Sequence, residues 1–145
     1  MLDRFAKEYA KWLRADVRIK DDRAVTKDDI ASHNLILFGD PGSNSIIAQI
    51  AAKLPIRWNR ESVIAGDQKF SAADHVPVLV YPNPLNPKRY VVLNSGHTFH
   101  EDEFRGTNAL LFPRLGDYAI IRLAGQREVV SAGLFGEKWE LKPRE

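Results

Sequence analysis

The chain has 145 residues, contains no cysteine and carries a formal net charge of +2 from 21 basic and 19 acidic residues. A chain of this length buries roughly 68–70% of its unfolded surface, so it can fold as one domain without covalent staples. The lack of cysteine excludes disulfides, thiolate catalysis and cysteine-ligated zinc. The basic residues are dispersed rather than clustered, so the electrostatic footprint of a nucleic-acid-binding protein is absent and no nucleic-acid partner is expected. No apolar run approaches the ~20 residues that cross a bilayer, so no membrane partner is expected either.

The first part of the chain predicts two helices and one short strand. Apolar residues recur at spacings of three and four over residues 2–13, the pattern of an amphipathic helix with an aromatic face. Charged residues interrupt this segment, so it does not have the pattern of a signal peptide. Residues 16–20 alternate polar and apolar side chains, as a half-buried or edge strand would. Thr26 and Asp29 are spaced as in a capping box, which predicts a short helix over Lys27–Ser32.

A strand, a tight turn and a helix are predicted between residues 34 and 54. Residues 35–38 are an unbroken apolar run that stops at Gly39, and such runs are typical of strands covered by helices on both faces. Residues 40–44 are rich in turn formers. Helical spacing of apolar residues then resumes at Ile46 and continues until Pro55 closes the helix.

Downstream segments predict further strands. Gly66 and Asp67 are expected to turn a small hairpin between Ser62–Ala65 and residues 69–71. The strands predicted over 76–81 and 90–93 are separated by too few residues for a crossover helix, so they are expected to pair antiparallel. The sequence also predicts a helix within 101–115, a strand over 118–123 and a short strand or helix within 129–141.

Strands that alternate with helices indicate an α/β fold. We expect a single domain over residues 1–145, built as a three-layer α/β/α arrangement with a mixed, mostly parallel sheet of the Rossmann or flavodoxin kind and one antiparallel hairpin. One orientation stays open. If strand 76–81 runs parallel to strand 35–38, His97 lies at the opposite end of the sheet from Gly39, whereas the reverse orientation brings these two residues together.

The turn over residues 39–45 is the main candidate binding site. A glycine-containing turn that leads into a helix exposes backbone N–H groups beside the positive end of the helix dipole, which suits a phosphate or a carboxylate. Neither the dinucleotide fingerprint nor the Walker motif is present, and the Asp40 carboxylate would repel an anion. The alternative is that Asp40 or Ser43 caps the helix while the glycines only make the turn. The candidate ligand-binding residues are Gly39, Asp40, Gly42, Ser43, Asn44 and Ser45, together with Asn83 from the proline-rich connection.

Two other kinds of chemistry have weaker support. His97 and His100, followed by three acidic residues, are side chains that can bind a metal or carry a proton in a metal-assisted hydrolase. An i, i+3 pair in a loop is a weaker metal motif than H-E-x-x-H, and the alternative is a solvated loop before a helix. We expect no cofactor and no bound metal.

No nucleophile of a serine hydrolase is recognisable. The elbow motif Gly-x-Ser-x-Gly does not occur in the chain. Three carboxylates lack an identifiable partner and are interpreted as solvated acids, and Trp58 is interpreted as a core or rim aromatic. These three acids are Asp67, Asp74 and Asp117. We therefore expect no catalytic residue within the chain.

Several segments, in order, resemble the C-terminal region of large bacterial proteins that carry an α/β-hydrolase or prolyl-oligopeptidase-like domain upstream. The resemblance covers roughly residues 16–123. It rests on NLILFGDPGSN at 34–44 with Ile47-Ala48, on LPI at 54–56, on YPNPLNP at 81–87, on YVV at 90–92 and on NSG at 94–96.

The resemblance implies a non-catalytic accessory domain of an exported esterase or peptidase, in the periplasm or outside the cell. Its partner would be the hydrolase domain of the same polypeptide, from which this chain would be a piece. Only a few motif positions carry over, namely Gly39, Asn44, the Asn83-Pro84 pair and Gly96. The second hypothesis is a stand-alone domain that binds a small phosphorylated or carboxylated ligand at the turn over 39–45.

Overall fold

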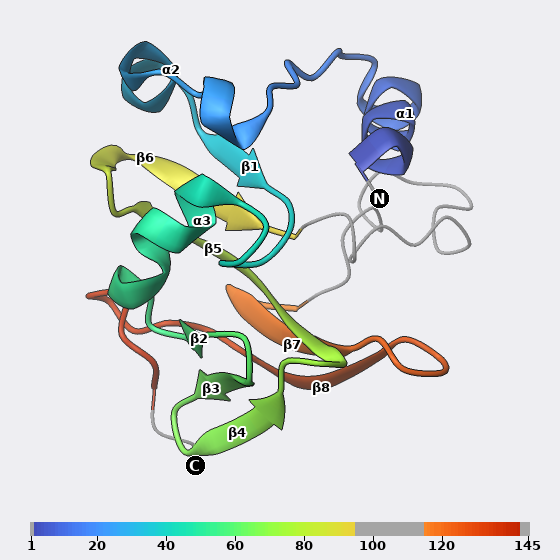
Figure 1. The fold of residues 1–145 in the computed structure, drawn as a ribbon, viewed down its shortest axis with the longest axis vertical. Coiled ribbons are helices and arrows are strands. Elements are labelled where there is room, and N and C mark those ends of the chain that lie inside the picture. Colours follow the sequence, from blue (N-terminus) through green and yellow to red (C-terminus); the bar gives the residue numbers. More distant parts are fainter. Residues whose placement is uncertain (1, 95–114, 143–145) are drawn as a thin grey trace.

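The computed structural model describes residues 2–94 and 115–142, and two β-sheets dominate them (Figure 1). The larger sheet has five strands in the order β1-β6-β5-β7-β8, and the smaller has three in the order β2-β3-β4. The helical elements are α1 (Leu2–Leu13), η1 (Asp22–Ala24), α2 (Lys27–Ser32), α3 (Ser45–Ile50) and η2 (Ala51–Lys53). The strands are β1 (Leu35–Leu37), β2 (Arg57–Trp58), β3 (Ser62–Ala65), β4 (Gln68–Ser71), β5 (His75–Asn83), β6 (Asn86–Leu93), β7 (Tyr118–Arg122) and β8 (Glu128–Gly133).

The N-terminal helices form where local signals predict them, but the strand predicted over 16–20 does not. In the capping box of α2, Asp29 N donates to Thr26 Oγ1 at 3.2 Å and Thr26 N donates to the Asp29 carboxylate at 2.8 Å. The strand prediction was wrong because residues 16–20 pair with no strand within residues 2–94 and 115–142. Instead Lys20 forms an ion pair with Asp29 at 2.7 Å. The hydrogen bonds from Lys20, and to a lesser extent those from Thr26, hold the pKa of Asp29 far below its usual value.

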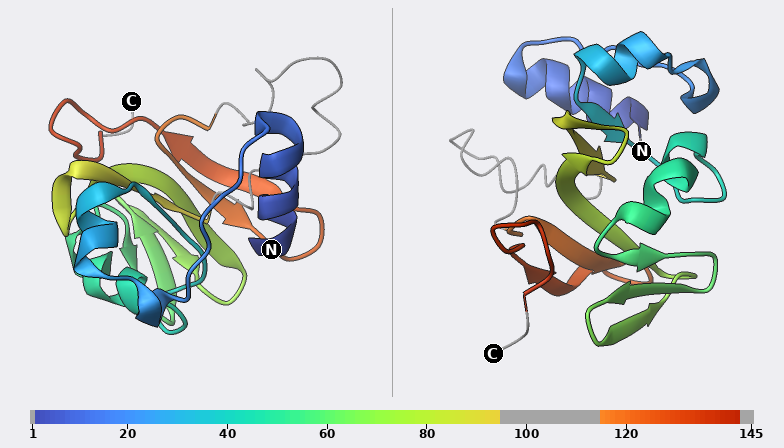
Figure 2. Two further views of the ribbon diagram at one scale, coloured as in Figure 1. Left: turned by 90° about the horizontal axis from the view of Figure 1, so that it is seen from above. Right: turned by 90° about the vertical axis from the view of Figure 1, so that its left-hand side faces the viewer.

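The three-layer, mostly parallel architecture is contradicted. Among the strands of the described residues, only β1 and β6 pair in parallel, while β6–β5, β5–β7 and β7–β8 are antiparallel and the three-stranded sheet is wholly antiparallel. A parallel sheet needs helical crossovers between successive strands. Among the described residues every helix lies before residue 54, and β3–β4, β5–β6 and β7–β8 are joined by hairpin turns or short loops. The smaller sheet therefore lies beside the larger one, where a covering layer of helices was expected (Figure 2).

The apolar run over 35–38 is also not a central strand. Strand β1 is at the edge of its sheet, and the apolar side chains of the run have different surroundings. Leu37 is 6% exposed in the core, whereas Ile36 is 38% exposed. Phe38 leaves the strand and packs edge-on against Phe5 of α1, with 5.2 Å between ring centroids. The continuous apolar run therefore contains one buried core position and one residue that contacts α1. Helices do not cover both faces of the strand.

Strand register brings one row of apolar side chains under α3. Leu37 lies opposite Leu93, and Leu93 lies opposite Leu79, so these three residues cross the sheet in line. Ile47 and Ile50 of α3 are fully buried on this row, and each such side chain contributes roughly 1.5–3 kcal/mol on burial. The same core includes Val63 and Ala65 of β3. One core thus joins the two sheets.

The other strand predictions are largely confirmed. The β3–β4 hairpin turns at Gly66 and Asp67, with Ala65 opposite Gln68. Strands β5 and β6 pair antiparallel, β7 covers the strand predicted over 118–123, and the terminal segment forms a strand, β8. The helix predicted within 101–115 falls almost wholly outside the described residues. None of the described helices has the length and apolar character needed to span a bilayer.

Candidate functional site

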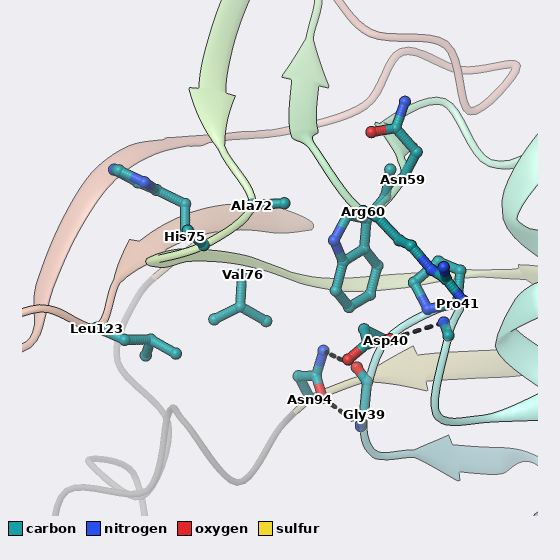
Figure 3. A pocket seen from close by; sticks show the side chains of 13 residues that line it. Gly39, Asp40, Pro41, Asn59, Arg60, Ala72, His75, Val76, Asn94 and Leu123 are labelled. Atoms are coloured by element: carbon teal, nitrogen blue, oxygen red, sulfur yellow. Dashed lines mark hydrogen bonds between the residues drawn. The ribbon is translucent and has the colours of Figure 1, made fainter.

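The parallel pairing of β1 with β6 brings the carboxyl ends of these strands together at Gly39. Asn94 follows β6, is 2% exposed and has a positive φ of 53°. Gly39 N donates to Asn94 Oδ1 at 3.0 Å, and Asn94 Nδ2 donates to Gly39 O at 3.1 Å and to Pro77 O at 3.4 Å (Figure 3). One buried amide thus clamps the turn to β5. The open question of orientation is resolved for the strands, because β5 runs antiparallel to β1, but His97 and His100 lie outside the described residues.

Asp40 and Ser43 close the turn upon itself. Asp40 Oδ1 accepts hydrogen bonds from Gly42 N at 2.6 Å and from Ser43 N at 3.0 Å. Ser43 Oγ in return accepts from Asp40 N at 2.9 Å. The φ of Gly39 is +113°, a conformation that residues with a Cβ rarely adopt. These contacts make the turn a compact unit whose amides face its own side chains.

Asn44 caps α3, so the prediction that Asp40 or Ser43 caps this helix is wrong. Asn44 Oδ1 accepts from Ile46 N and from Ile47 N, each at 3.0 Å. Ser45 N donates to the carboxylate of Asp22 at 2.7 Å. Hydrogen bonding from the Ser45 side chain, together with this backbone bond, holds the pKa of Asp22 below its usual value. From Gly39 to Ile47, every backbone N–H therefore has an acceptor within the protein. A ligand at this turn must be held by side chains.

A pocket of about 330 Å³ lies beside the turn. Its walls are the turn after β1, the end of β2 with the loop that follows it, the β4–β5 turn with the start of β5, and two positions next to strand ends, Asn94 and Leu123. Of the residues predicted to bind a ligand, three line this pocket, namely Gly39, Asp40 and Gly42. Ser43, Asn44 and Ser45 do not, because their polar groups are used inside the turn and the helix cap.

Asn83 is remote from the pocket. It ends β5, whereas His75 at the start of the same strand lines the pocket. Asn83 is fully buried, and its Oδ1 accepts from Leu85 N at 2.9 Å within the β5–β6 turn. Its Nδ2 has no hydrogen-bond partner in the part of the chain that the structure describes. The structure therefore does not bring Asn83 together with the other candidate residues.

The loop between β2 and β3 supplies side chains that the sequence did not single out as ligands. Asn59 Oδ1 accepts from Glu61 N and Ser62 N, both at 2.9 Å, and holds the loop in shape. Arg60 and the half-buried Trp58 at the end of β2 line the pocket, and neither side chain forms a hydrogen bond or ion pair with any described residue. They lie in the irregular segment between residues 56 and 75, where no periodicity or motif marks them. Only the fold brings them opposite the turn.

Two of the acids interpreted as solvated have protein partners. Asp74 Oδ1 lies 2.7 Å from His75 Nδ1, and Asp117 Oδ2 accepts from Phe135 N at 2.9 Å. The His75 ring lies 5.3 Å from the ring of Phe70 and points away from the other labelled residues of the pocket (Figure 3). Within the described ranges, no group of three or more histidine or acidic residues is arranged to hold a metal ion.

No family model, curated protein or solved structure matches the chain. The resemblance to a hydrolase-associated domain therefore stays a prediction, and the pocket is interpreted on its own chemistry.

Proposed function

We propose that this chain is a binding domain for a small organic carboxylate, which it takes up in the pocket between the turn after β1 and the loop between β2 and β3. The observation that carries the proposal is the Arg60 guanidinium, which lines the pocket without any described protein partner. A guanidinium presents paired N–H donors that match both oxygens of a carboxylate. Because Arg60 has no described partner, its N–H donors are available to a carboxylate in the pocket.

The remaining walls favour a carboxylate with an apolar body. Trp58, Val76 and Leu123 line the pocket with apolar surface, and Leu123 is 41% exposed. The volume of about 330 Å³ lies at the lower end of the range for ligand pockets, about 300–1,000 Å³, which suits a metabolite of modest size. A phosphate is less favoured, because the turn offers no free amide and the nearby Asp40 would repel a second negative charge.

A comparison of two arginines tests the proposal. Titration of the protein with a panel of small carboxylates, followed by NMR, is expected to shift resonances of the pocket residues. Arg60→Ala should weaken binding by about tenfold or more, the value of one charge-assisted hydrogen-bonded pair. Arg57→Ala makes the same change in charge on β2 outside the pocket and should bind as the unmodified chain does. An equal loss of affinity in both variants would contradict the proposal. So would a titration in which no carboxylate shifts the resonances of the pocket residues.

The predicted setting of this domain is a separate question. Attachment to an exported hydrolase, in the periplasm or outside the cell, is supported by the resemblance of residues 16–123 alone. A binding domain of this kind would present a carboxylate substrate or product to the neighbouring hydrolase. The reading frame of the gene tests this part, because a gene product that consists of this chain alone would remove it.

A further inference from the structure

The carboxylate of Asp40 uses only one of its two oxygens in hydrogen bonds with the described residues. Its Oδ1 accepts from Gly42 N and Ser43 N, whereas Oδ2 makes no hydrogen bond or ion pair with any described residue. Asp40 is exposed and lines the same pocket as Arg60. The pocket therefore contains one negative and one positive side chain, each with a free hydrogen-bonding edge.

Gly42 separates these two charges. A Cβ added at Gly42 would lie 3.0 Å from Asp40 Oδ1 and 3.6 Å from Arg60 Nε, so the two side chains flank this position. They are neighbours, yet no ion pair joins them. Figure 3 shows Asp40 between Arg60 on one side and Asn94 with Gly39 on the other. Glycine leaves the space between the two charges open.

We infer that the ligand of this pocket is a zwitterion, an α-amino acid with an apolar side chain. The inference rests on the proposed function and narrows it. Arg60 binds the carboxylate, and Asp40 Oδ2 accepts a hydrogen bond from the ammonium group, while the side chain of the amino acid lies against Trp58, Val76 and Leu123. A simple anion meets repulsion from Asp40 and a simple amine meets repulsion from Arg60, so only a molecule with both charges satisfies both walls.

Three probes of the same shape test the two charges separately. These are leucine, isocaproate (leucine without its amino group) and isoamylamine (leucine without its carboxylate). By NMR titration of the full chain, leucine should bind about tenfold more tightly than isocaproate, and isoamylamine more weakly still, because each lost charge leaves one wall unpaired. Added salt should weaken the binding of leucine.

Asp40→Asn provides the decisive variant. An asparagine oxygen can accept from Gly42 N and Ser43 N as the carboxylate does, so the turn is retained and only the charge is lost. The preference for leucine over isocaproate should disappear in this variant. It should persist in Asp67→Asn, which makes the same change in the exposed β3–β4 turn. Gly42→Ala, which places a methyl group between the charges, should weaken leucine more than isocaproate.

The outcomes separate this inference from the proposed function. If the unmodified chain binds isocaproate as tightly as leucine, or if Asp40→Asn keeps the preference, the zwitterion is excluded while the carboxylate site stands. If isoamylamine binds most tightly, or if none of the three probes shifts the pocket resonances, both proposals fail. Binding of leucine that is lost in Arg60→Ala and loses its preference in Asp40→Asn supports both.

Discussion

The turn after β1 and the loop between β2 and β3 face the same pocket, and they use their polar groups in different ways. In the turn, every backbone N–H has an acceptor, and Asn94 ties Gly39 to the neighbouring strands. In the loop, Asn59 satisfies the backbone, but the Arg60 side chain has no hydrogen-bond or ion-pair partner among the described residues, and neither has the indole N–H of Trp58 at the end of β2. The backbone donors of the turn are all paired within the protein, whereas the side-chain donors of Arg60 in the loop have no partner among the described residues.

Because of this difference, we expect the hydrogen bonds of the turn to contribute to stability and the Arg60 side chain to contribute to ligand binding. A saturated turn contributes to folding because each buried donor or acceptor left unpaired costs about 1–3 kcal/mol. An unpaired surface arginine contributes little to folding, because its charge remains solvated in the unbound state. Substitutions that remove the internal hydrogen bonds of the turn should therefore change stability, whereas substitution of Arg60 in the loop should change binding and leave stability nearly unchanged.

The largest effect is expected at Asn94. Asn94→Ala removes three hydrogen bonds at a buried position and should lower the free energy of unfolding by about 2–4 kcal/mol, measured by urea denaturation. Asn94→Gly loses the same bonds but tolerates the φ of 53°, so it should be less destabilised by about 1 kcal/mol. A nearly neutral Asn94→Ala would show that the clamp does not hold the turn.

A substitution at Gly39 should have the next largest effect. Gly39→Ala combines a φ of +113° with a Cβ only 2.7 Å from Ser43 Oγ, and should cost about 2 kcal/mol in denaturation. Gly66→Ala is the matched control, because its φ is +63° and no atom lies within 4 Å of the added Cβ, so about 1 kcal/mol is expected. Part of the cost at Gly39 should disappear when Ser43 is also alanine. Equal costs at both glycines would exclude the steric contribution.

A smaller effect, visible only in acid, is expected at Asp22. Hydrogen bonding from the side chain and the backbone of Ser45 lowers the pKa of Asp22 below its usual value of 3.8 in the folded chain. The ionised form is therefore favoured by folding, and this stability is present above pH 3.8 and is lost as the pH falls through the folded pKa. Asp22→Asn should flatten the acid side of the stability curve. Asp21→Asn, which removes a carboxylate without a capping bond, should leave the curve unchanged.

The smallest effect on stability is expected at Arg60. Arg60→Ala should change the free energy of unfolding by less than about 0.5 kcal/mol, because the guanidinium has no described partner to lose. Asp40→Ala on the other wall removes the acceptor of two amides and should cost about 1 kcal/mol. If Arg60→Ala destabilised the chain more than Asp40→Ala, the contrast between the two walls would be wrong.

Predictions from the sequence were correct where the interacting residues lie close together along the chain. The capping box of α2 needs only Thr26 and Asp29, three residues apart, and the β3–β4 hairpin needs only its turn and alternating flanks. The turn over 39–45 was also recognised, and three of its residues line the pocket. The capping residue was misassigned because Asp40, Ser43 and Asn44 are all good caps, and only backbone direction selects among them.

Local sequence signals suffice for the helices over Leu2–Leu13 and Lys27–Ser32, for the β3–β4 and β5–β6 hairpins and for the turn that follows β1. The parallel pairing of β1 with β6, the separation into two sheets and the site depend on contacts between distant parts of the chain. Asn94 meets Gly39 across 55 residues, and Arg60 reaches the pocket from a segment with no regular pattern. Such contacts depend on the packing of the whole core, which selects one arrangement among many that local propensity allows equally.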